Sequence, residues 1–178
     1  MSVKTLLDLS GRVALVTGGS RGLGLQIAEA LGEMGAKVAI TARKSEELDH
    51  AIGQLKDHNI TAQSFVADIG KRETIAPLAE AVLKKFGKVD ILVNNAGATW
   101  GAPAEDYPDE AWHKVMNLNV NAMFFLSRAY RRVPASVGGV QARFSRIGAF
   151  ASTCRPCGVT VAIPRFPSSS RITSLPSA

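Results

Sequence analysis

The sequence predicts an α/β fold built on a doubly wound parallel sheet. Short apolar runs rich in β-branched residues alternate with segments whose apolar residues recur at helical spacing. The segments between the strands are long enough to form crossover helices, which join parallel strands in the same sheet. We expect the alternation to end after the fourth strand–helix unit and an irregular C-terminal tail to follow.

Each expected element follows from a local pattern. The strands are expected at 12–17, 37–41, 60–67 and 89–93, where apolar runs are bounded by glycine or polar residues. The helices are expected at 23–34, from Ser45 as an N-cap residue, at 71–86 and at 109–130. The strand at 89–93 is expected to form an unpaired apolar edge, because no fifth strand pattern follows it.

The chain divides into two unlike parts. Of its 178 residues, 1–130 carry nine Lys, five Arg and all 15 acidic residues, whereas 131–178 carry seven Arg, no Lys and no acid. The second part also holds eight Ser and five Pro, and only 159–163 resembles a strand. We expect an incomplete α/β domain at 1–130 and an aberrant tail at 131–178. Our hypothesis is that the tail is frame-shifted or disordered; the alternative is a genuine but divergent tail.

Composition excludes several classes of protein. No apolar run approaches the roughly 20 residues of a membrane span, and no secretory signal is expected. Two Cys exclude a disulfide scaffold and fit a reducing compartment, so a cytoplasmic protein is expected. The basic tail lacks the interleaved aromatic residues of a nucleic-acid binder, so neither a nucleic acid nor a membrane is expected as a partner.

A glycine-rich loop lies where the first strand meets the first helix. It comprises Thr17, Gly18, Gly19, Ser20, Arg21, Gly22, Leu23 and Gly24. Glycines allow the backbone N–H groups of such a loop to approach a pyrophosphate at a helix N-terminus. The alternative is a plain strand–helix turn.

Basic residues follow the second strand. Ala42, Arg43 and Lys44 stand where an NAD-preferring site usually carries an acid for the adenosine ribose. With Arg21 in the loop, these cations suit a 2′-phosphate, so NADP(H) is favoured over NAD(H). The alternative is a solvated basic turn.

The third and fourth strands end in further candidates. Asp68 follows one strand, and Asn94-Asn95-Ala96-Gly97 follows the other. The carboxyl ends of parallel strands are where open α/β sheets bind ligands. Asp68 can accept from an adenine amino group, although it can equally cap the next helix.

These motifs together resemble the short-chain dehydrogenases/reductases, a Rossmann-type family. The resemblance implies that 1–130 is an incomplete NAD(P)-binding Rossmann domain. The resemblance covers about 8–130 and includes Asn119 within Val115-Met-Asn-Leu-Asn119. Within the family, 9–17 and 41–44 are similar to gluconate 5-dehydrogenase-like and 3-oxoacyl-carrier-protein-reductase-like members. Such enzymes act with NAD(P)(H) on secondary alcohols or ketones and are homo-dimers or homo-tetramers.

The resemblance implies roles for individual residues. Ser20, Arg21 and Leu23 would hold the phosphates and Arg43 the 2′-phosphate. Asp68 and Ile69 would flank adenine, whereas Asn95, Ala96 and Gly97 would line the ribose. Asn119 would be the active-site Asn of the family; no metal site is expected.

The catalytic acid of the family is missing from the sequence. The family places a Lys four residues after its catalytic Tyr, but Tyr107 is followed at that place by Ala111 and Tyr130 by Pro134. No Lys occurs after Lys114. Two functions are therefore weighed: an NADP(H)-dependent oxidoreductase by family, or a catalytically silent NADP(H)-binding fragment.

Overall fold

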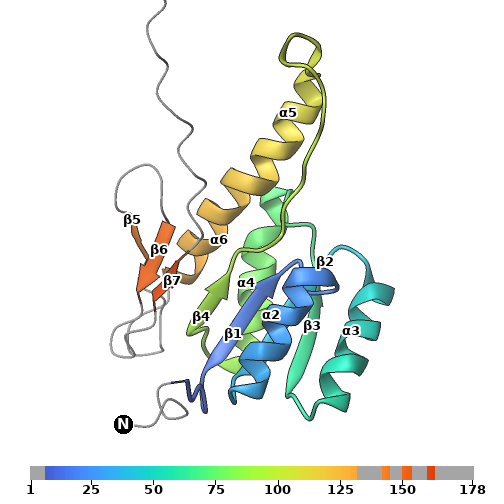
Figure 1. The fold of residues 1–178 in the computed structure, drawn as a ribbon. Coiled ribbons are helices and arrows are strands. Elements are labelled where there is room, and N and C mark those ends of the chain that lie inside the picture. The colour runs from blue at the N-terminus through green and yellow to red at the C-terminus, as the bar shows by residue number, and fades with distance from the viewer. Residues whose placement is uncertain (1–6, 132–141, 145–149, 154–159, 163–178) are drawn as a thin grey trace, which may run out of the picture.

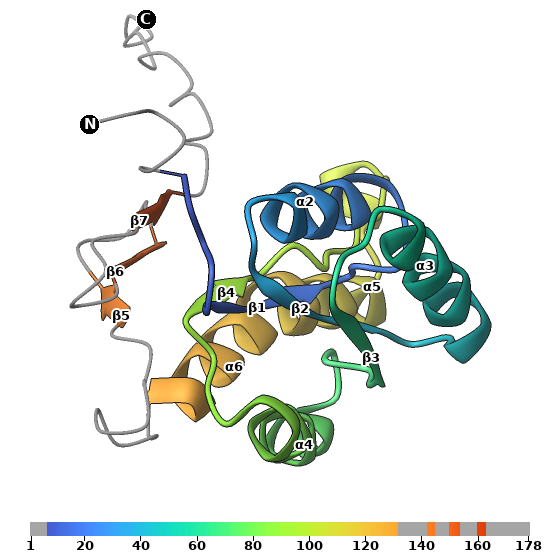
Figure 2. The same ribbon diagram turned by 90° about the horizontal axis from the view of Figure 1, so that it is seen from below.

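The central feature of the molecule is a four-stranded parallel sheet between two layers of helices (Figures 1 and 2). The structure is a computed structural model that describes residues 7–131 and three short strands at 142–144, 150–153 and 160–162. The sheet order is β3-β2-β1-β4. Its strands are β1 (Val13–Thr17), β2 (Lys37–Ala42), β3 (Ala62–Val66) and β4 (Ile91–Val93). The doubly wound fold is thereby confirmed.

Two apolar layers bury the faces of this sheet. Figure 2 shows α2 (Gly22–Glu33) and α3 (Ser45–Asp57) on one face, with α4 (Ile75–Phe86) and α6 (Ala122–Arg131) on the other. The α2/α3 face is packed by a cluster that includes Val16, Ile40 and Leu48. The opposite face buries Leu15, Leu126 and Tyr130. Because side chains are buried on both faces of the sheet, the strands appear in the sequence as continuous apolar runs and not as alternating apolar and polar residues.

The long helix expected at 109–130 contains an interruption. It consists of α5 (Asp109–Met116), a π-helical turn (Asn117–Asn121) and α6. A π-helical turn accommodates one extra residue without ending the helix, so the apolar period alone does not disclose it. Short 3₁₀ turns at Arg72–Thr74 and Ala104–Asp106 precede α4 and α5.

The register brings the strand ends to one edge of the sheet. Thr17 of β1 lies beside Thr41 of β2, and Val16 lies beside Val93 of β4. Within the described residues, β4 pairs with β1 alone, so β4 is the edge strand that the sequence predicts. The loops that follow all four strands therefore converge at the carboxyl edge.

The described part of the tail contains more regular structure than expected. The strand predicted at 159–163 corresponds to β7 (Thr160–Ala162), but β5 (Ala142–Phe144) and β6 (Phe150–Thr153) were not predicted. The three strands form a separate antiparallel sheet in the order β5-β6-β7. Strands of three or four residues are too short for an alternating pattern to identify. The rest of 132–178, and with it the frame-shift hypothesis, lies outside the described residues.

No helix among residues 7–131 is long and apolar enough to cross a bilayer.

Candidate nucleotide-binding site

The glycine-rich loop is held tightly between β1, α2 and the segment after β4. Gly18 has a left-handed φ of 65° and donates its backbone N–H to the Thr41 carbonyl oxygen at 2.8 Å. A Cβ atom on Gly24 would overlap the Gly18 carbonyl oxygen, so the first turn of α2 packs directly against the loop. Only glycine satisfies this close approach, which explains the spacing of the motif.

The start of α2 has no side-chain cap. Arg21 occupies the N-cap position in an extended conformation, and no side chain accepts a hydrogen bond from the first turn. The first N–H groups of a helix need acceptors, and their dipoles favour an anion. The loop therefore presents unsatisfied donors beside the cleft.

Thr17 and Asn95 join the ends of β1 and β4. The Thr17 hydroxyl donates to the Val93 carbonyl at 3.2 Å and accepts from the backbone N–H groups of Asn95 and Ala96 at 3.0 and 3.1 Å. The Asn95 side-chain amide donates to the carbonyl oxygens of Thr17 and Gly18 at 3.0 and 3.3 Å. Thr17 is fully buried, so its contribution is to position the loops.

A cleft of about 310 Å³ opens between these loops, within the range of small-molecule sites. Nine of the thirteen predicted cofactor-binding residues line it: Gly18, Ser20, Arg21, Arg43, Asp68, Ile69, Asn95, Ala96 and Gly97. The structure does not place the other four on its wall. Thr17 and Gly24 pack behind the wall, Gly22 has open space around it, and the Leu23 side chain is 66% exposed.

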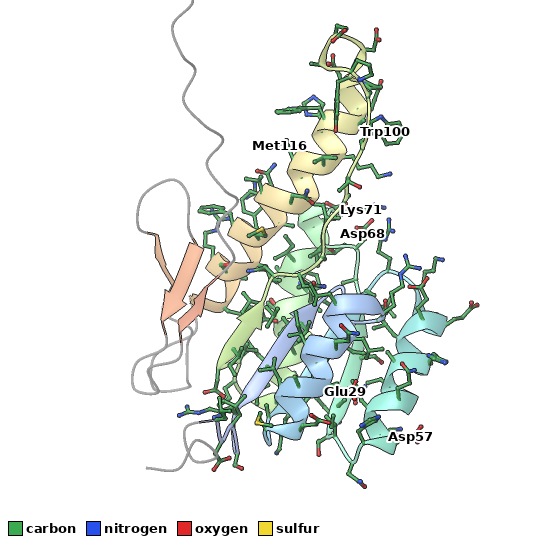
Figure 3. All side chains as sticks on the ribbon, in the orientation of Figure 1. Glu29, Asp57, Asp68, Lys71, Trp100 and Met116 are labelled. Atoms are coloured by element: carbon green, nitrogen blue, oxygen red, sulfur yellow. The ribbon has the colours of Figure 1, made fainter. Side chains whose placement is uncertain are left out.

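Asp68 has a structural role as well as a place in the cleft. Figure 3 shows it with Lys71 beyond the strand ends, whereas Glu29 and Asp57 lie toward the other end of the molecule. Its Oδ1 accepts from the Gly70 backbone N–H at 3.2 Å, and its carbonyl accepts from Lys71 N–H and the Thr74 hydroxyl. The side chain therefore caps the turn and lines the cleft at the same time.

Charged side chains gather at the mouth of the cleft. Lys44 Nζ lies 3.0 Å and Arg21 Nη1 3.9 Å from Glu47 Oε1, and the Ser20 hydroxyl donates to Glu47 Oε2 at 3.3 Å. The hydrogen bond from Lys44 is the main cause of a lowered pKa of the Glu47 carboxyl, and the charge of Arg21 adds to it. Arg43 lines the same cleft and forms no ion pair with any described residue.

Glu47 was not among the predicted site residues. Ser45 was expected to cap α3, but Ser45 is the first helical residue and Lys44 occupies the N-cap position without a side-chain cap bond. The spacing of three residues between Lys44 and Glu47 could have indicated their contact on one helix face. Lys44, which was expected among the cations for a 2′-phosphate, also lines the cleft. Lining residues that were not predicted as binding residues are Thr41, Ala42, Ala67 and Leu118.

Asn119 lies in the π-helical turn and holds the segment after β4. Its Oδ1 accepts from the Ala98 backbone N–H, and its Nδ2 donates to the Ala98 carbonyl, both at 2.8 Å. A Cβ atom on Gly97 would lie 3.4 Å from Asn119 Oδ1. One donor and the acceptor oxygen of the side-chain amide thus bond to the backbone of Ala98, and Asn119 holds the segment after β4 in place.

Neither tyrosine lines the cleft. Tyr130 is 1% exposed in the core, and its hydroxyl has no hydrogen-bond partner among the described residues. Burial raises the pKa of Tyr130 well above its ordinary value of 10.0, which keeps the phenol protonated. Tyr107 makes an edge-to-face contact with Trp112, with ring centroids 6.2 Å apart. The described part of the cleft therefore contains no tyrosine acid.

A second polar cluster joins α2 to the end of α3. Oxygen atoms of Glu29 and Glu33 and a nitrogen of His58 lie within 4.8 Å of one another, a contact that the sequence analysis did not foresee. His58 Nδ1 lies 3.3 Å from Glu29 Oε1, and half of its side-chain surface is exposed. We interpret these residues as a polar surface contact between the helices.

The family model of the short chain dehydrogenases matches residues 12–140. The chain belongs to this family. The resemblance stated from the motifs is thereby confirmed. Gluconate 5-dehydrogenase of Gluconobacter oxydans is 39% identical over 132 residues, which cover 74% of this chain and 52% of that protein. The rhamnolipids biosynthesis 3-oxoacyl-[acyl-carrier-protein] reductase of Pseudomonas aeruginosa is 46% identical over 117 residues, 66% of this chain and 45% of that protein.

One solved structure has a similar fold. L-sorbose reductase from Gluconobacter frateurii, complexed with NADPH and L-sorbose, superposes with a TM-score of 0.67 at 35% identity. The match covers 69% of this chain and 47% of that one. The chain spans about half the length of the curated relatives that it matches.

Proposed function

We propose that this chain is the NADP(H)-binding part of a short-chain oxidoreductase that acts on a secondary alcohol or ketone. The observation that carries the proposal is the meeting of the uncapped glycine-rich loop and the cations after β2 in one cleft. The sorbose reductase, whose solved structure contains NADPH and a ketose, supports the choice of cofactor and substrate class. A cytoplasmic homo-dimer or homo-tetramer is part of the same proposal.

The residues present fit such a nucleotide. The backbone N–H groups of Ser20 to Gly22 and the start of α2 would hold the pyrophosphate. Arg43, which has no ion-pair partner among the described residues, would bind the 2′-phosphate. Asp68 and Ile69 would flank the adenine.

The rest of the cleft would hold the nicotinamide side of the nucleotide. Gly97 and Ala96 leave room for a ribose, and Asn119 holds their segment in place through Ala98. The nucleotide, when bound, supplies or accepts a hydride. Asn119 is a positioning residue in this proposal, and Leu23 would contribute through its backbone because its side chain faces solvent.

A second candidate function is nucleotide binding without turnover. Ketone reduction leaves an alkoxide that a positioned acid must protonate. Neither Tyr107 nor Tyr130 lines the cleft, and no Lys follows Lys114 in the sequence. This observation favours a silent NADP(H)-binding fragment, because residues 131–178 hold no Tyr, His, Lys, Asp or Glu that could act as the acid.

The test is a fluorescence titration of the full chain with NADPH and with NADH, followed by an assay of NADPH oxidation with ketones that include L-sorbose. Arg43→Ala should raise the Kd for NADPH about tenfold or more, because a hydrogen bond to a charged group contributes about 1.5–3 kcal/mol. Its Kd for NADH should change little. Lys37→Ala is the matched control, since Lys37 is an exposed cation at the opposite end of β2.

The outcomes separate the two candidates. Binding with ketone-dependent oxidation supports the oxidoreductase, and binding without oxidation supports the silent fragment. If Arg43→Ala and Lys37→Ala affect NADPH equally, Arg43 does not bind the 2′-phosphate.

A further inference from the structure

One carboxylate stands among the cations at the mouth of the cleft. Glu47 lies in the first turn of α3 and lines the cleft together with Arg21 and Lys44. Its two oxygens contact three groups of the proposed phosphate subsite: Lys44 Nζ at 3.0 Å, Arg21 Nη1 at 3.9 Å and the Ser20 hydroxyl at 3.3 Å. The carboxylate thus occupies donors that an incoming phosphate would use.

Four charged side chains lie together at the mouth of the cleft. Arg21, Arg43 and Lys44 supply three positive charges, and Glu47 supplies one negative charge. A phosphate monoester brings between one and a half and two further negative charges at neutral pH. Only Arg43 is free of an ion pair with the described residues, so a phosphate must compete with Glu47 for the other two cations.

We propose that Glu47 is a specificity-determining residue that lowers the preference of this site for NADP(H) over NAD(H). A 2′-phosphate can reach Lys44 and Arg21 only by displacing the Glu47 carboxylate or by lying beside it. The first route breaks the existing ion pairs, and the second places like charges together, which is unfavourable. NAD(H) has no phosphate at this position and avoids both penalties. This inference rests on the proposed function.

The test compares Glu47→Gln with Glu46→Gln in the full chain. Glutamine keeps the size of the side chain and removes its charge. Glu46 is the matched control, because it is an exposed carboxylate in the same first turn and forms no ion pair with any described residue. Affinities for NADPH, NADH, 2′,5′-ADP and 5′-AMP are measured by isothermal titration calorimetry. The last two nucleotides differ only in the 2′-phosphate, so they isolate its contribution.

Glu47→Gln should lower the Kd for NADPH and 2′,5′-ADP about threefold to tenfold, as expected for two partly exposed ion pairs. The Kd for NADH and 5′-AMP should stay within about twofold, and Glu46→Gln should behave like the wild type. The effect of Glu47→Gln should shrink at about 1 M salt, because the screening length falls to about 3 Å.

Three results would overturn the inference. One is weaker binding of 2′,5′-ADP by Glu47→Gln, which would mean that Glu47 orients the cations for the phosphate. Another is an equal gain for all four nucleotides, and a third is an equal effect of Glu46→Gln. If none of the four nucleotides binds saturably to the folded wild type or to either variant, the proposed function is refuted, and the inference with it.

Discussion

Replacing a glycine with alanine should change the free energy of unfolding in opposite directions at two positions in neighbouring helices. Gly24 lies in the first turn of α2, where an added Cβ atom would overlap the Gly18 carbonyl oxygen and press on the Asn95 amide. Gly53 lies in α3, where an added Cβ atom would meet nothing within 4 Å. The comparison therefore separates the close approach at the loop from the general effect of replacing glycine in a helix.

The magnitudes follow from these surroundings. Gly53→Ala should raise the free energy of unfolding by about 0.4–1 kcal/mol, because alanine restricts the unfolded chain and favours a helix. In Gly24→Ala, the preference of alanine for a helix can raise the free energy of unfolding by at most the same amount. The added Cβ atom forces the loop to move, however, and overpacking of this kind lowers the free energy of unfolding by about 1–3 kcal/mol. The Asn95–Gly18 hydrogen bond contributes about 1 kcal/mol more to the loss. We expect Gly24→Ala to be destabilised by about 1–3 kcal/mol overall.

The assay is urea unfolding of the full chain, followed by NADPH titration of each folded variant. Gly24→Ala should also raise the Kd for NADPH at least about tenfold, because the displaced loop no longer presents its N–H groups. Gly53→Ala should leave that Kd unchanged. Equal changes in the free energy of unfolding for the two variants would mean that Gly24 does not pack closely against the loop.

Two further predictions concern side chains next to the cleft and in the core. Asn119→Ala should lower the free energy of unfolding by about 1–3 kcal/mol, since it leaves both backbone groups of Ala98 without partners; the exposed Asn121→Ala is the control in the same denaturation series. Tyr130→Phe removes a buried hydroxyl without a partner among the described residues, so the unfolding free energy should stay equal or rise by up to about 1 kcal/mol. Because burial raises the pKa of Tyr130, the wild type should also lose stability as the pH rises above about 10, where the unfolded chain releases this proton first. Tyr130→Phe should reduce that loss, and an unchanged pH profile would contradict the assignment.

The sequence was most informative where local pattern and tertiary structure agree. The apolar run at 12–17, the glycines after it and the helix that follows are specified by residues close in the chain, so β1, the loop and α2 were all predicted. The parallel arrangement then places Asp68 and Asn95 at the same edge without any knowledge of side-chain contacts.

What the sequence did not disclose depends on contacts across the fold. In the sequence, Glu47 has the features of an ordinary residue in the first turn of a helix. Its place in the cleft becomes clear only from its contact with Arg21, which lies on another loop. Likewise, Asn119 in the π-helical turn pairs with Ala98, twenty-one positions away, and this contact is seen only in the structure. The sequence excludes Tyr130 as the catalytic acid, because no Lys lies four residues after it. Its burial in the core is seen only in the structure.

We propose that the cleft at the carboxyl edge of the sheet binds NADP(H). The most direct measurement is a calorimetric titration of the full 178-residue chain with NADPH, with NADH in parallel and circular dichroism to establish that the protein is folded. We predict saturable binding of one NADPH per chain, tighter than binding of NADH. A folded chain that shows no saturable binding of NADPH would mean that the cleft is not an NADP(H) site.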